Sequence, residues 1–141
     1  MNSCNKEEEV ISPAENIDEE PKITLINNGS LSWEIVEVQG PGISVSFEQP
    51  NQSITLRTGQ RYTFINLGGA SHPLDFRNSK NEILLSQDLQ VGSFENDPEV
   101  NFVFDFSEDL AAFTLTESLA AELSSYNCSF HEAMKGNIFI E

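Results

Sequence analysis

Short runs of β-branched and aromatic residues, separated by turn sequences, dominate the chain from Lys22 onward. Two of the turns are Asn-Asn-Gly-Ser at 27–30 and Gln-Gly-Pro-Gly at 39–42. Such spacing is typical of antiparallel strands in a sandwich or barrel, and no long helical period competes with it. We therefore predict an all-β fold of about eight short strands, drawn from the runs 23–26, 32–38, 43–47, 53–57, 61–66, 82–85, 101–106, 112–116 and 137–141.

Two local patterns refine this expectation. Phe102, Phe104 and Phe106 alternate with other residues, which predicts a strand with one aromatic face. Thr116 precedes an apolar stretch with acids near its start, and this predicts a Thr-capped short helix over 117–123.

The length of 141 residues suits one domain, and ten Phe supply apolar material for its core. The formal net charge of −16 argues against nucleic-acid binding and against polybasic attachment to lipid. Residues 1–21 carry seven acids and one lysine, and we expect them to be a disordered acidic leader before a domain at 22–141. That domain carries 16 acids and six bases, and eleven of its acids lie between Glu82 and Glu132.

The chain has two cysteines, Cys4 and Cys128, in different surroundings. The start Met-Asn-Ser-Cys, followed by acids, resembles a mature lipoprotein whose Cys4 carries lipid and whose leader is a tether. That reading predicts a location at the cell envelope, in the periplasm or on the extracellular face. The alternatives are a free cysteine in an acidic tail and, less in keeping with such a tail, a Cys4–Cys128 disulfide.

Residues 126–136 contain most of the candidate metal ligands of the chain. Within seven residues Cys128, His131 and Met134 offer a thiolate, an imidazole and a thioether, which are three of the four ligands of a blue-copper site. Such a site needs a second imidazole, and the only other histidine is His72, in the glycine-rich segment 67–76 that we expect to be a loop. Singly, each residue has an ordinary interpretation as core filler or a loop histidine; together they favour copper.

The motif Cys-x-x-His-x-x-Met-x-Gly, the strand 61–66 and the loop ending in His72 resemble the cupredoxins, single-domain blue copper proteins such as plastocyanin, halocyanin and amicyanin. The resemblance covers about residues 51–141. It implies a Greek-key β-sandwich with a short helix before the copper loop, and one type 1 copper held by His72, Cys128, His131 and Met134.

The sequence also departs from the family. Where many cupredoxins place an Asn after the first histidine ligand to tie the ligand loops together, Pro73 stands here and has no N–H to donate. Ser129 is a candidate for part of that tie, and a surface serine is the alternative. Phe130 occupies a position where relatives often carry Pro.

The resemblance implies outer-sphere electron transfer through the edge of His131. We expect no enzymatic activity, because two histidines are too few for a multicopper enzyme and no catalytic arrangement of residues stands out. Phe130, Ala133, Pro73 and Leu74 would form an apolar docking collar or else belong to the core. The acidic stretch would steer a basic partner, such as a c-type cytochrome or an oxidase or reductase, or would only confer solubility. We expect a monomer. A copper-carrying or copper-storing envelope protein and a metal-free interaction domain remain alternative functions.

Overall fold

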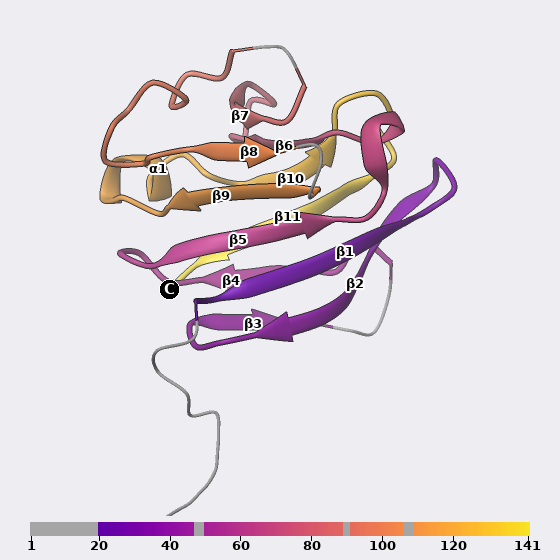
Figure 1. Ribbon diagram of the computed structural model, residues 1–141, viewed down its shortest axis with the longest axis horizontal. Helices are drawn as coiled ribbons and strands as arrows, with labels where there is room; N and C mark the ends of the chain where they lie inside the picture. Colours follow the sequence, from indigo (N-terminus) through magenta and orange to yellow (C-terminus); the bar gives the residue numbers. More distant parts are fainter. Residues whose placement is uncertain (1–19, 47–49, 89–90, 106–108) are drawn as a thin grey trace, which may run out of the picture.

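The computed structural model describes residues 20–46, 50–88, 91–105 and 109–141. In this part of the chain strands predominate, which confirms the all-β prediction, although there are eleven of them rather than about eight (Figure 1). The elements are β1 (Lys22–Asn28), β2 (Ser32–Gln39), β3 (Ile43–Val45), β4 (Ile54–Leu56), β5 (Arg61–Asn66), the 3-10 turn η2 (Gly69–Ser71), β6 (Leu74–Arg77), β7 (Ile83–Ser86), β8 (Val103–Asp105), β9 (Leu110–Thr114), α1 (Glu117–Ala120), β10 (Ser125–Cys128) and β11 (Lys135–Ile140).

The strands form two sheets in a sandwich-like arrangement. One sheet has the order β2-β1-β5-β9-β8 and the other β3-β4-β11-β10-β6-β7. Both are mixed rather than purely antiparallel, because β1 pairs with β5 and β4 pairs with β11 in parallel. A parallel pair needs a long crossover connection, and here the chain between β1 and β5 visits the second sheet at β3 and β4. Local strand patterns do not reveal such a crossover.

Two strands lie where the sequence pattern predicts none. β6 occupies Leu74–Arg77, so the expectation of a loop over the whole of 67–76 is wrong in its last part. β10 occupies Ser125–Cys128, and all four of its residues are buried. β10 lies between β11 and β6 inside its sheet, so its polar composition conceals a central strand.

The helix prediction is confirmed at its start. The Thr116 hydroxyl accepts a hydrogen bond from the Leu119 amide at 3.1 Å, as an N-cap should. The helix ends at Ala120 rather than at residue 123. The ring of Phe104 in β8 lies 5.8 Å from the ring of Phe102, which directly precedes the strand. This supports the predicted aromatic face, while Phe106 lies outside the described residues.

The core lies between the sheets and is rich in aromatic rings. Phe64 of β5 and Phe113 of β9 belong to one sheet, and Phe76 of β6 belongs to the other. The Phe76 ring centroid lies 4.9 Å from each of the other two, in edge-to-face arrangements. These contacts join the two sheets, and Phe76 itself belongs to the strand that follows His72.

The two ends of the sandwich differ. The loops after β5 and after β10 lie side by side at the right of Figure 1, whereas the start of β1 and the C-terminus lie at the left. At that left end Pro21 is buried, and its carbonyl accepts a hydrogen bond from the Thr63 amide. Pro21, the last residue of the predicted leader, therefore already contacts the sheet. Among the described residues, no helix has the length and apolar character needed to cross a membrane.

Candidate metal centre

His72 is delivered by the turn that follows β5. The chain bends through η2, where Gly69 has a φ of +74°, a conformation that favours glycine. The His72 amide then donates to the Gly69 carbonyl at 3.0 Å. The histidine side chain is 8% exposed, so the turn places an imidazole at the rim of the core.

Cys128, His131 and Met134 belong to one closed loop. Cys128 is the last residue of β10 and is only 2% exposed. Its amide donates to the Met134 carbonyl at 3.0 Å, and the Met134 amide donates to the His131 carbonyl at 3.1 Å. Since β10 and β11 pair on either side of this loop, the loop is held on a rigid antiparallel base.

Three of the four predicted ligands converge. The Cys128 Sγ lies 3.7 Å from His72 Nδ1 and 3.3 Å from His131 Nδ1. Possible ligand atoms of all three residues lie within 4.8 Å of one another. Bond lengths of about 2.0 Å to an imidazole nitrogen and about 2.3 Å to a thiolate place such donors roughly 3.6–3.8 Å apart around one d-block ion. The 3.7 Å distance lies in this range and the 3.3 Å distance is slightly shorter, so the three donors are close enough to share one metal ion.

Met134 is fully buried in the loop, and its backbone helps to close it. Its role as a fourth ligand remains a prediction. In sites of this type a thioether is a weak axial ligand, which is the role predicted for Met134.

Burial sets the protonation chemistry of the site. It raises the pKa of the Cys128 thiol above its ordinary value. It lowers the pKa of His72, and the nearby His131 lowers it further. The metal-free site thus favours a neutral thiol and a neutral His72, and a metal ion must displace the thiol proton to bind.

Two amide side chains fix the backbone around His72. The Asn66 amide donates to the His72 carbonyl at 2.7 Å and to Gln87 Oε1 at 2.8 Å. Gln87 Oε1 also accepts from the Leu74 amide at 3.0 Å. Both amide side chains are buried, and the sequence patterns single out neither of them. The one sequence signal that could have indicated such a role is the position of Asn66, at the end of a strand before a ligand loop.

The connection between the two ligand loops runs through Ser129. Its amide donates to the Pro73 carbonyl at 2.9 Å, and its hydroxyl donates to Asp75 Oδ1 at 2.6 Å. Ser129 therefore does contribute to the tie, and the alternative of a plain surface serine is wrong. Asp75, its partner, is not among the residues that the sequence patterns single out.

The predicted apolar collar is only partly present. Phe130 is 57% exposed and Ala133 is exposed. Pro73 and Leu74 are buried, so their assignment to an exposed collar is wrong. Leu74 begins β6, and its side chain joins the hydrophobic core.

The histidines differ in exposure. His131 is half-buried and is the more accessible of the two, whereas His72 is buried. An accessible imidazole edge on a bound metal offers a short path between the metal and the surface. The route through His131 itself remains a prediction.

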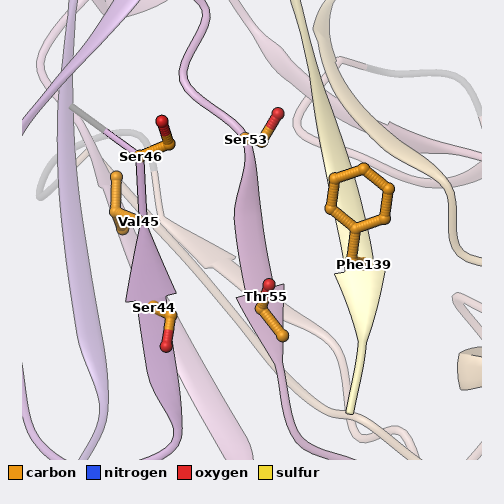
Figure 2. A pocket seen from close by; sticks show the side chains of 6 residues that line it. All are labelled: Ser44, Val45, Ser46, Ser53, Thr55 and Phe139. Atoms are coloured by element: carbon orange, nitrogen blue, oxygen red, sulfur yellow. The ribbon is translucent and has the colours of Figure 1, made fainter. Parts of the chain in front are cut away.

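Two hollows in the surface add little to the metal centre. A shallow hollow of about 340 Å³ lies over β3, β4 and β11, where side chains of Ser44, Thr55 and Phe139 point outward (Figure 2). Its lining holds no charged side chain and none of the predicted ligands. A smaller hollow of 170 Å³ reaches Cys128 and is lined also by Arg77, Asn81, Asn127, Glu132 and Lys135.

No protein-family model matches the chain, and no curated protein or solved structure matches it either. Cys4, the predicted site of lipid attachment, lies outside the described residues. The interpretation of the centre therefore depends on its own geometry.

Proposed function

We propose that this chain is a small blue copper protein of the cupredoxin type, with a Greek-key sandwich, that transfers single electrons between redox partners. One copper ion would be held by His72, Cys128, His131 and Met134. The observation that carries the proposal is the convergence of the Cys128 sulfur with the Nδ1 atoms of two histidines from separate loops.

The donor set favours copper over zinc. Structural zinc sites take four strong ligands in a tetrahedron, whereas this site brings together three strong donors, to which the proposal adds the thioether of Met134. Two imidazoles, one thiolate and a weak axial thioether are the blue-copper combination. When bound, copper supplies one-electron chemistry by alternating between Cu(I) and Cu(II).

The chain contributes fixed ligand positions. Hydrogen bonds from Asn66 and Ser129 hold the backbone beside His72 and Cys128, so the ligands need not rearrange when the charge of the site changes. Electrons would enter and leave through the half-buried edge of His131, with Phe130 and Ala133 as apolar neighbours at the docking surface.

The partner is proposed to be a basic redox protein, such as a c-type cytochrome or an oxidase or reductase, attracted by the acidic domain. The protein would act as a monomer and have no enzymatic activity of its own. Its location would be the cell envelope, with Cys4 as the lipid anchor.

The test compares electron transfer with copper release. Reduced, copper-loaded protein is mixed in a stopped-flow instrument with an oxidised basic c-type cytochrome, and separately with a Cu(I) chelator. We expect rapid and complete oxidation by the cytochrome and slow loss of copper to the chelator. Slow oxidation together with ready copper loss would contradict electron transfer and favour the copper carrier.

A further inference from the structure

We propose that Asp75 and Ser129 are positioning residues: together they form a buried carboxylate lock that fixes the Cys128 loop relative to the His72 loop. The lock would replace the side-chain tie that Pro73 cannot make. This inference rests on the proposed function, because it concerns the ligands of the same copper site.

The Asp75 carboxylate is completely buried and accepts hydrogen bonds on both oxygens. Oδ1 accepts from the hydroxyls of Ser129 and Ser86. Oδ2 accepts from Arg77, at 2.7 Å from Nη2 and 3.2 Å from Nε. One carboxylate thus connects β6, β7 and the residue directly after Cys128.

Strand register explains why these groups meet. β6 and β10 are antiparallel neighbours in which Leu74 pairs with Cys128 and Asp75 pairs with Asn127. Side chains alternate between the faces of a sheet. Asp75 and Ser129, each one residue from the Leu74–Cys128 pair, therefore point to the same face and can meet beside it.

The hydrogen-bond donors around Asp75 match a carboxylate better than an amide side chain. The two serine hydroxyls and the Arg77 guanidinium all donate, and an ionised carboxylate has only acceptors. An Asn at this position would turn an NH₂ group toward one set of donors. Hydrogen bonds to a charged group are also the stronger kind, which suits a lock on a loop.

The lock acts together with one backbone bond. The Ser129 amide donates to the Pro73 carbonyl at 2.9 Å, while the Ser129 hydroxyl reaches Asp75. The residue after the thiolate is thus joined twice to the segment after His72. Without the Ser129 hydroxyl, only the backbone hydrogen bond to Pro73 remains of these two connections.

The chain offers a matched control for this idea. Ser86→Ala and Ser129→Ala each remove one hydroxyl from the same oxygen of Asp75. Ser86 is the last residue of β7 and belongs to neither ligand loop, although its neighbour Gln87 bonds the segment after His72. Its hydroxyl also accepts from the Asp88 amide, so its loss disrupts at least as many hydrogen bonds. Ser129→Thr keeps the hydroxyl and serves as the conservative variant.

The first readout needs no metal. In a Cys4→Ser background, the rate at which a thiol reagent modifies Cys128 reports how often the loop opens, because Cys128 is buried. We expect Ser129→Ala to raise this rate roughly tenfold or more, as loss of a hydrogen bond to a charged group would. Ser129→Thr and Ser86→Ala should stay near the parent rate, measured where all variants are folded by denaturant titration.

The second readout uses the copper-loaded protein. Ser129→Ala should change the thiolate-to-copper absorption and the reduction potential, while Ser86→Ala leaves both unchanged. Equal thiol reactivity in Ser129→Ala and Ser86→Ala would overturn the lock whether or not copper binds. A parent protein that shows no copper absorption would instead contradict the proposed function, and the thiol rates would still decide this inference.

Discussion

At the scale of single residues, two members of the site, Cys128 and His72, are groups whose pKa values burial shifts toward the uncharged form. The Cys128 thiol holds its proton more tightly than a free cysteine does, since burial raises its pKa. His72 holds a proton less tightly than usual, since burial and His131 lower its pKa. Of these two groups, the Cys128 thiol is the one whose proton a metal ion must displace.

This competition predicts a pH dependence of copper binding. Below the raised thiol pKa, each unit of rising pH should increase the apparent affinity about tenfold, because binding releases one proton. Competition titrations against a chelator of known protonation between about pH 6.5 and 8 provide the measurement. The slope should vanish in Cys128→Ser, and a slope that survives there would assign the released proton to another group.

Met134 requires a test of its own because its side chain is buried and its ligand role is a prediction. Met134→Leu conserves apolar volume but removes the thioether. We expect the variant to keep copper and to have a higher reduction potential, since the axial ligand tunes the potential. An unchanged potential, measured by voltammetry, would remove Met134 from the ligand set.

The convergence of His72, Cys128 and His131 could be predicted from sequence, but most of the residues around them could not, Ser129 being the exception. Cys128 and His131 share one short loop, and His72 is the only other histidine, so residue type alone brings them together. Asp75 and Gln87 look like ordinary polar residues. Their roles appear only when the register of β6 with its neighbours is known.

At the scale of elements, β10 and β11 form the base on which the ligand loop stands. Tyr126 of β10 pairs with Gly136 of β11, and the tyrosine ring lies over the glycine. A Cβ at Gly136 would come within 2.2–2.3 Å of that ring. The Tyr126 hydroxyl is anchored on the Gln52 carbonyl at 2.5 Å, so the ring has no free path away.

Gly136→Ala should therefore displace Tyr126 and the adjoining ligand loop. We expect a loss of about 3 kcal/mol in the free energy of unfolding, as overpacking of a core produces. Gly29→Ala is the control: Gly29 has a φ of +58° and no neighbour within 4 Å of an added Cβ, so it should lose only about 1 kcal/mol. Equal losses of unfolding free energy in the two variants, measured by denaturant titration, would show that the Tyr126 ring moves aside at little cost and would contradict this prediction.

The same scale explains which strands the sequence conceals. β5 and β9 contain clear apolar runs and were predictable, whereas β10 reads Ser-Tyr-Asn-Cys and is nevertheless buried throughout. Its polar side chains are satisfied by neighbours, as when Asn127 donates to Ser125 Oγ at 2.8 Å. Parallel pairing of β1 with β5 joins segments far apart in sequence, which local patterns cannot specify.

At the scale of the whole molecule, charge is the property that a partner meets first. The full chain carries −16, and residues 22–141 carry 16 acids against six bases. Such an excess raises the encounter rate with a basic protein and is screened by salt.

Electron transfer to a basic c-type cytochrome should accordingly slow as ionic strength rises from about 0.01 to 0.15 M, where the screening length falls from roughly 30 to 8 Å. Oxidation by an anionic complex such as hexacyanoferrate is the control and should speed up over the same range. A cytochrome rate that does not depend on salt, measured by stopped flow, would leave the acidic surface with a solubilising role only.

The central claim is that His72, Cys128 and His131 hold one copper ion through a copper–thiolate bond. Titration of the metal-free protein with Cu(II), followed by visible absorption, tests it most directly. We predict an intense blue colour that saturates at one copper per chain and is absent in Cys128→Ser. Stoichiometric binding of copper by a protein that stays colourless would contradict the claim.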